Sequence, residues 1–213
     1  MYKTVVFDLD GTLLDTLDDL ADAVNFALAQ HALPTRSVKE IRAFLGNGMA
    51  NLIQNAAGGA EDTQEILATF KARYAAHSMD KTKPYEGVME LLAELKKQGI
   101  KTAILSNKAD FAVQPLTKKY FGALIDAAQG ENEAEGVLRK PDAGGVYEIM
   151  KKLNATAAET VFVGDSEVDI RTAENAGVDC ISVTWGFRDE EELRKNGAKT
   201  LVSEPLKILD LCK

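Results

Sequence analysis

Two aspartates near the start of the chain are the first residues suited to chemistry. The segment Asp8-Leu9-Asp10-Gly11-Thr12 follows the apolar run Thr4–Phe7. Residues two apart in an extended chain point to the same face, so the carboxylates of Asp8 and Asp10 can converge. Two buried carboxylates repel each other and need a cation, a shared proton, or both. Taken alone, the segment also fits a strand that ends in a helix-capping turn.

A second acidic segment, Gly164-Asp165-Ser166-Glu167-Val168-Asp169, follows another apolar run. Asp165 and Asp169 are four residues apart and share a face if a helix begins at once. Oxygen ligands from Asp8, Asp10, Asp165 and Asp169, without histidine or cysteine, select a hard cation. Few protein ligands beside a substrate phosphate favour Mg²⁺. Helix capping by Asp165 accounts for that residue but not for the whole set.

A hydroxyl, an amide and a lysine complete the candidate site. Ser106 and Asn107 follow the run Thr102–Leu105. Hydroxyls and backbone amides hold phosphate oxygens, although Ser106 by itself also fits a helix cap. Pro141 is expected in the first turn of a helix, which places Lys140 at the positive helix end, where a cation is unfavourable unless an anion offsets it. A solvent-exposed lysine is the alternative.

The elements that must position these residues form an α/β pattern. Short β-branched runs alternate with longer helical patterns, which predicts a parallel sheet with helices on both faces. Ligands of such sheets bind beyond the carboxyl ends of the strands, so one shared site is expected. The predicted strands are Thr4–Phe7, Thr102–Leu105, Thr160–Val163 and Cys180–Val183, with Thr200–Val202 and Ala123–Ala127 as weaker candidates.

The segment between the first two clear strands lacks a strand pattern and is longer than a crossover helix needs. It predicts a helical lobe. Ser37-Val38-Lys39-Glu40 is a capping box, further helices are expected from near Met49 and over Thr63–Ala76, and Val88–Gln98 is the crossover helix. We therefore expect a helical cap domain at residues 15–84, inserted into a catalytic core formed by residues 1–14 and 85–213.

Composition excludes several classes of function. The chain has 213 residues, with 25 Lys and Arg against 33 Asp and Glu, for a net charge of −8. This charge gives no long-range attraction to nucleic acid or to an anionic membrane, so neither is an expected partner. Two cysteines and no signal-peptide or membrane-spanning pattern favour a cytoplasmic protein. The acidic stretch Glu131–Glu135 is expected to be a solvated loop.

The four motifs together resemble those of the haloacid dehalogenase superfamily of phosphohydrolases, in order and in spacing. Within that superfamily the chain looks like the phosphoglycolate phosphatase group, with a helical cap between the first and second motifs. The resemblance covers essentially the whole chain. It implies a Rossmann-like three-layer fold whose parallel sheet has the order 3-2-1-4-5. The matching segments are Asp8-Leu9-Asp10-Gly11-Thr12, Ser106, Lys140-Pro141 and Gly164–Asp169.

The resemblance also implies a role for each matching residue. Asp8 is the nucleophile that forms an aspartyl-phosphate, and Asp10 is the general acid and then the general base. Ser106 and Lys140 hold the phosphoryl oxygens. Mg²⁺ is held by Asp8, by the main-chain carbonyl of Asp10 and by Asp165, with Asp169 a ligand or a neighbour of one. Thr12 and Asn107 are expected to bind substrate.

Specificity is expected to come from the cap, because the core motifs contact only phosphate. Leu45-Gly46-Asn47-Gly48-Met49 joins two predicted cap helices. It resembles the cap loop of phosphoglycolate phosphatases, in which Gly46, Asn47 and Gly48 would offer backbone amides to a small carboxylate. Arg42, one turn earlier, can reach the same anion. A plain helix–helix turn and a surface arginine are the alternatives.

We therefore expect a Mg²⁺-dependent phosphatase for a small phosphorylated metabolite, with 2-phosphoglycolate favoured. An inorganic pyrophosphatase or a sugar-phosphate phosphatase would use the same machinery. A phosphoglucomutase is less favoured, because its basic, serine-containing cap segment is missing. A phospho-acceptor receiver module is disfavoured, because Asp8 and Asp10 share one strand and the cap has no counterpart there. The sequence carries no indication of oligomeric state.

Overall fold

The computed structural model describes residues 1–60, 62–132, 136 and 138–213. The chain forms two compact units, one of Met1–Leu14 with Pro84–Lys213 and one of Asp15–Lys83. The short strands β2 (Leu14–Asp15) and β3 (Lys83–Pro84) form a separate two-stranded sheet where the chain passes from one unit to the other. Of the acidic stretch expected as a loop, residues 133–135 lie outside the described residues.

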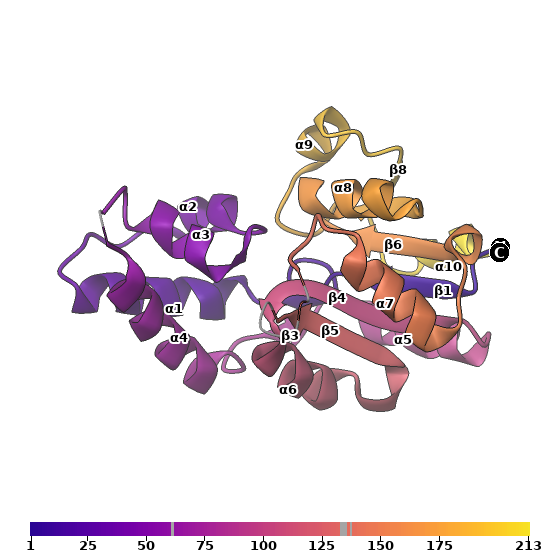
Figure 1. Ribbon diagram of the computed structural model, residues 1–213, viewed down its shortest axis with the longest axis horizontal. Helices are drawn as coiled ribbons and strands as arrows, with labels where there is room; N and C mark the ends of the chain where they lie inside the picture. Colours follow the sequence, from indigo (N-terminus) through magenta and orange to yellow (C-terminus); the bar gives the residue numbers. More distant parts are fainter. Residues whose placement is uncertain (61, 133–135, 137) are drawn as a thin grey trace. The chain divides into compact units, whose positions relative to one another are not determined.

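The first unit contains a six-stranded parallel sheet (Figure 1). Its spatial order is β5-β4-β1-β6-β7-β8, which is 3-2-1-4-5-6 in the succession of these strands along the chain. The predicted α/β class is confirmed. The strands are β1 (Thr4–Phe7), β4 (Lys101–Ala109), β5 (Ala127–Glu131), β6 (Thr160–Gly164), β7 (Asp179–Val183) and β8 (Thr200–Val202).

The prediction of a strand at Ala123–Ala127 is wrong in its position. Gly122–Leu124 forms a short 3₁₀ helix, η1, and β5 begins only at Ala127. The amide of Asp126 donates to the carbonyl of Thr102, and the Asp126 carboxylate accepts from the Thr102 amide at 2.9 Å. The chain therefore joins the edge of β4 at Asp126, after the 3₁₀ turn has ended.

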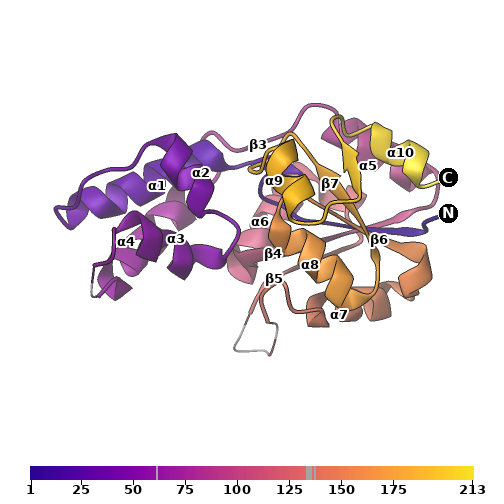
Figure 2. The same ribbon diagram turned by 90° about the horizontal axis from the view of Figure 1, so that it is seen from above.

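Helices cover both faces of the sheet. Helices α7 and α8 lie together on one face, and α5 and α10 lie together on the other (Figure 2). Under α7 and α8 the fully buried side chains of Val6, Ala103 and Phe162 form part of one apolar cluster with Val146 and Ile149. The helices are α5 (Val88–Lys97), α6 (Asp110–Tyr120), α7 (Gly144–Leu153), α8 (Glu167–Ala176), α9 (Glu190–Lys195) and α10 (Lys207–Leu211), with a 3₁₀ turn η3 at Ala157–Glu159.

The second unit is helical, as the pattern predicts. It consists of α1 (Leu17–Gln30), α2 (Val38–Phe44), α3 (Gly48–Ala56) and α4 (Gln64–His77). The capping box of Ser37 and Glu40 is present at the start of α2. Phe70 and Tyr74 of α4 are buried and stack with ring centroids 5.6 Å apart. Within the described residues, none of the helices combines the length and apolar character that crossing a membrane requires.

Candidate active site

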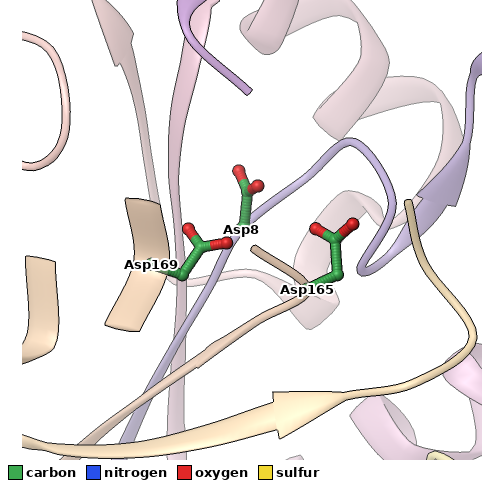
Figure 3. Close-up of side chains that lie close together, drawn as sticks. All are labelled: Asp8, Asp165 and Asp169. Atoms are coloured by element: carbon green, nitrogen blue, oxygen red, sulfur yellow. The ribbon is translucent and has the colours of Figure 1, made fainter. Parts of the chain in front are cut away.

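Three carboxylates converge at the carboxyl edge of the central strands (Figure 3). Asp8 follows β1, Asp165 follows β6, and Asp169 lies in the first turn of α8. Strands β1 and β6 are parallel neighbours, with Phe7 opposite Val163, so both chains leave the sheet at the same edge. One carboxylate oxygen from each aspartate lies within 4.8 Å of the others, and all three residues are buried.

Asp8 is held by both its backbone and its side chain. Its amide donates to the carbonyl of Val163 at 2.9 Å, which continues the β1–β6 ladder by one residue. Its Oδ1 accepts from the amide of Leu9 at 2.7 Å and lies 2.8 Å from Nζ of Lys140. Asp8 is only 8% exposed, so its carboxylate is fixed in a largely dry site.

Lys140 lies between two of these carboxylates. Its Nζ is 2.8 Å from Asp8 Oδ1 and 2.7 Å from Asp169 Oδ1, and its side chain is 3% exposed. Burial alone would lower the pKa of Lys140, but the attraction of Asp169 and Asp8 raises it above its usual value. Lys140 is therefore a permanent buried cation within the acidic cluster.

The expectation that Pro141 opens the helix and that Lys140 sits at its positive end is wrong. Helix α7 begins at Gly144, because the Asp142 carboxylate accepts from the Gly144 amide at 2.8 Å and forms a turn before the helix. The backbone of Lys140 is instead fixed by Asn107. The Lys140 amide donates to Asn107 Oδ1 at 2.7 Å, and Asn107 Nδ2 donates to the Lys140 carbonyl at 3.1 Å.

The remaining negative charge of the cluster raises the pKa values of two of its members. Burial, followed by the repulsion of Asp169 and Asp10, outweighs the attraction of Lys140 and raises the pKa of Asp8 to about 7. Burial, then repulsion by Asp169 and Asp8, raises the pKa of Asp165 well above its usual range. Three carboxylates against one lysine leave an excess of two negative charges among these four residues.

This excess charge and the donor set fit a divalent cation. The three aspartates offer only carboxylate oxygens, the ligands that hard cations such as Mg²⁺ and Ca²⁺ take. A cation here would lie where burial most disfavours the ionised carboxylates. The structure therefore agrees with a metal site built on Asp8, Asp165 and Asp169.

The loop Trp185–Phe187, which follows β7, holds Asp165. The amide of Phe187 donates to Asp165 Oδ2 at 2.6 Å, while the Thr12 hydroxyl donates to Asp165 Oδ1 at 3.2 Å. Trp185 Nε1 donates to the carbonyl of Thr12 at 3.0 Å. A Cβ on Gly186 would lie 2.3 Å from Asp165 Cβ, so only glycine fits at this position. The loop therefore fixes both carboxylate oxygens of Asp165 through Thr12 and Phe187.

Asp169 caps the helix on which it lies. Its Oδ2 accepts from the amide and the hydroxyl of Ser166, at 3.0 and 2.6 Å, while its Oδ1 contacts Lys140. Asp169 is fully buried. Each of its oxygens thus has a protein partner, whichever role it takes toward a metal.

Asp10 has a partner that the sequence analysis missed. Lys108 Nζ lies 3.0 and 2.9 Å from the two carboxylate oxygens of Asp10. Lys108 directly follows Ser106-Asn107, but a lysine after a predicted strand end gives no signal of its own. Only the extension of β4 to Ala109 brings it beside Asp10.

The predicted phosphate-binding residues lie in the same unit as Asp8. Ser106 is 4% exposed and its Oγ accepts from the amide of Lys108 at 3.2 Å. Thr12, which is 1% exposed, contacts Asp165 as described above. Asn107, predicted to bind substrate, uses both ends of its amide to hold Lys140. Asn107 therefore positions the lysine.

The predicted cap residues belong to the second unit. Arg42 lies in the last turn of α2, Gly46 follows that helix, and Asn47 is the N-cap of α3, which begins at Gly48. Gly46 and Gly48 have positive φ values of 110° and 81°. The turn thus presents the first amides of a nine-residue helix next to two glycines.

Comparison with known proteins identifies the family of the chain. The family model described as haloacid dehalogenase-like hydrolase matches residues 5–183. Phosphoglycolate phosphatase 1 of Pseudomonas aeruginosa is 33% identical over 99% of this chain and 79% of its own length. Phosphoglycolate phosphatase of Caulobacter vibrioides is 32% identical over 98% of this chain and 90% of its own.

A crystal structure of a candidate phosphoglycolate phosphatase from Lactobacillus delbrueckii subsp. bulgaricus superposes with a TM-score of 0.92. It is 35% identical and covers 99% of this chain and 98% of its own. The resemblance seen in the four motifs, to phosphoglycolate phosphatase-like hydrolases, is confirmed. The chain belongs to the haloacid dehalogenase-like hydrolase family.

Proposed function

We propose that this protein is a Mg²⁺-dependent phosphatase that hydrolyses a small phosphomonoester, and that 2-phosphoglycolate is its preferred substrate. The observation that carries the proposal is the buried Asp8 carboxylate, held against Lys140 and beside Asp165 at the strand ends. The family match and the phosphoglycolate phosphatases among the relatives support the same reaction.

Asp8 acts as the nucleophile in this proposal. Lys140 and the Leu9 amide both contact Oδ1, so we assign the attack on phosphorus to Oδ2. A bond forms between Oδ2 and phosphorus as the bond from phosphorus to the alcohol oxygen breaks. Asp10 gives its proton to the departing oxygen. It then takes a proton from the water that attacks phosphorus and releases Asp8 and inorganic phosphate.

Lys140 and Ser106 hold the phosphoryl oxygens during this transfer. The ammonium of Lys140 is fixed by two carboxylates and by Asn107 at its backbone, so it needs little reorganisation when negative charge builds up on the phosphoryl group. Ser106 offers its hydroxyl from the neighbouring strand β4, three residues before that strand ends.

Mg²⁺ is proposed to bind Asp8, the main-chain carbonyl of Asp10 and Asp165, with Asp169 beside them. When bound, the cation supplies positive charge that offsets the phosphoryl oxygens. The Thr12 hydroxyl and the Phe187 amide would keep the Asp165 carboxylate in one orientation for this role.

Magnesium should stabilise the protein more at pH 8 than at pH 5.5. The pKa of Asp8 is raised to about 7 and that of Asp165 is raised as well, so the folded metal-free protein holds protons that the unfolded chain releases. The contribution of these two groups to stability is therefore greatest at low pH and is lost as the pH rises through 7. Mg²⁺ replaces those protons, and at 100 times its Kd it adds about 2.7 kcal/mol.

Thermal unfolding with Mg²⁺ or with EDTA at both pH values measures this difference. Asp165→Asn should remove the gain, while Asp22→Asn, at an exposed aspartate of the helical unit, should leave it unchanged. A gain in Tm that is equal at both pH values, or that persists in Asp165→Asn, would contradict the proposed ligand set.

The two units have different roles in this proposal. The core, residues 1–14 and 85–213, carries the chemistry, and the helical cap, residues 15–84, selects the substrate. Gly46, Asn47 and Gly48 offer backbone amides at the start of α3 to the substrate carboxylate, and Arg42 adds positive charge one turn earlier. A phosphate ester that carries a carboxylate suits this set of groups.

Gly48→Val should lower kcat/KM for phosphoglycolate by about tenfold or more, because valine disfavours the φ of +81° and displaces the amides at the start of α3. Hydrolysis of p-nitrophenyl phosphate, which has no carboxylate, should change much less. Gly59→Val is the matched control, since Gly59 lies in the same unit with a φ of +87° and nothing within 4 Å of an added Cβ. Equal losses of kcat/KM on both esters, or equal effects of the two variants, would mean that this turn does not select the substrate.

A panel of phosphorylated compounds tests the proposed function as a whole. Release of inorganic phosphate is measured with Mg²⁺ for phosphoglycolate, glycerol phosphate, several sugar phosphates and pyrophosphate. The proposal expects the highest kcat/KM for phosphoglycolate. A preference for pyrophosphate or for a sugar phosphate would mean that the protein is a phosphate-releasing hydrolase with a different substrate. Isomerisation of a sugar phosphate without phosphate release would indicate a mutase.

A further inference from the structure

Lys108 is a buried lysine whose ammonium group contacts both carboxylate oxygens of Asp10. The two N–O distances are 3.0 and 2.9 Å. The side chain of Lys108 is 2% exposed, whereas that of Asp10 is 18% exposed. A buried ammonium requires a counter-charge, and here that charge comes from a residue at the rim of the site.

The extension of β4 brings these two residues together. Phe7 of β1 pairs with Ile104 of β4 in parallel register. Asp10 lies three residues beyond Phe7, and Lys108 lies four residues beyond Ile104 in the extension of β4, so both lie past the last β1–β4 pair at the same end of these neighbouring strands. The amide of Lys108 also donates to Ser106 Oγ at 3.2 Å. One residue therefore contacts both the proposed acid and a proposed phosphate ligand.

We propose that Lys108 is a positioning residue that fixes the carboxyl group of Asp10 for proton transfer to the leaving oxygen. This inference rests on the proposed function, in which Asp10 acts as general acid and base. An aspartate side chain turns freely about two bonds, and contacts to both oxygens remove that freedom. One oxygen can carry the proton while the other keeps its contact with the ammonium.

The contribution of Lys108 should depend on the leaving group. An alkyl ester such as phosphoglycolate has a strongly basic alkoxide as its leaving group, which needs a well-placed acid. The p-nitrophenolate of p-nitrophenyl phosphate is weakly basic and leaves with little help from an acid. A catalytic group misplaced by about 1 Å can lower the rate by a factor of about 10². Lys108→Met should therefore lower kcat by about 10- to 100-fold on phosphoglycolate and by less than about fivefold on p-nitrophenyl phosphate.

The experiment measures kcat and KM on both esters for Lys108→Met, Asp10→Asn and the double variant. Circular dichroism and thermal unfolding confirm that each variant is folded. Lys108→Gln is the second variant if Lys108→Met does not fold, and Lys108→Arg, which keeps the charge, should recover part of the loss. Lys152→Met, at an exposed lysine of α7, is the control for removing a lysine.

Two results support the inference together: a loss confined to kcat on the alkyl ester, and a double variant no slower than Asp10→Asn. Equal losses on both esters for Lys108→Met and Lys108→Gln, or additive losses in the double variant, would overturn it. The proposed function fails separately, and this inference with it, if Asp10→Asn itself slows both esters equally.

Discussion

Asp8→Asn is expected to abolish phosphate release while leaving the protein folded. The amide cannot form the acyl-phosphate, so turnover should fall by roughly 10⁴-fold or more, as in other enzymes that lose their nucleophile. Asparagine has nearly the same shape as aspartate and can keep the contacts of Oδ1 with Lys140 and the Leu9 amide.

The stability of this variant should match or exceed that of the parent in the absence of metal. Burial disfavours the ionised form of Asp8, whose pKa is raised to about 7, so a neutral amide removes an unfavourable charge at pH 8. Asp169 still provides Lys140 with a counter-charge 2.7 Å away.

Two measurements check the nucleophile. Phosphate release is followed for purified Asp8→Asn, with Asp22→Asn as a control for the same substitution at an exposed position. In the active protein, rapid acid quenching with labelled substrate should trap phosphate on the protein, and peptide mapping should place it on Asp8. Near-normal release by a folded Asp8→Asn, or label on another residue, would reject the assignment.

The parts of the fold that the sequence predicts are those with strong local signals. The first and fourth of the clearly predicted strands end at their predicted residues, Phe7 and Val183, because each is a short run rich in apolar, β-branched side chains. The capping box at Ser37 and Glu40 starts α2 where expected. Ala123–Ala127 was misplaced because its alanines fit a strand and a 3₁₀ turn equally well, and the pairing of Asp126 with Thr102 decides between them.

Some residues of the candidate site are likewise predictable from the sequence, and others are not. Asp8 and Asp165 are predictable because each is a carboxylate directly after an apolar strand, and Asp169 because it follows Asp165 by four residues at the start of a helix. Lys108 and the loop Trp185–Phe187 are not, because their roles arise from long-range contacts. The Phe187 amide that holds Asp165 is a backbone group, so the type of residue 187 carries no signal of this contact.

Lys140→Met should have the second large effect, on stability as well as activity. Lys140 is a cation enclosed by Asp8 and Asp169, and its Nζ lies 5.5 Å from the centroid of the Phe162 ring. Methionine fills a similar volume without charge. Its substitution leaves buried carboxylates without their counter-charge, a change that typically costs about 3–5 kcal/mol.

The stability lost in Lys140→Met should increase with pH. The pKa of Asp8 and that of Asp165 are already raised in the parent, and loss of the cation raises them further. The folded variant therefore holds protons over a wider range of pH than the unfolded chain does. Its deficit relative to the parent should be largest at pH 8 and should shrink toward pH 5, where the carboxylates are neutralised by protonation.

Urea unfolding of Lys140→Met and its parent at pH 5 and pH 8, in EDTA, measures this deficit, with Lys152→Met as the exposed control. Activity at pH 8 with Mg²⁺ should fall by at least about 10²–10³-fold, because a fixed donor to the phosphoryl group is lost. The double variant Lys140→Met/Asp169→Asn should be more stable than Lys140→Met at pH 8, since it removes one uncompensated charge together with its partner. A deficit that is the same at both pH values, or a double variant less stable than the single one, would mean that packing around Phe162 and not charge compensation makes Lys140 important.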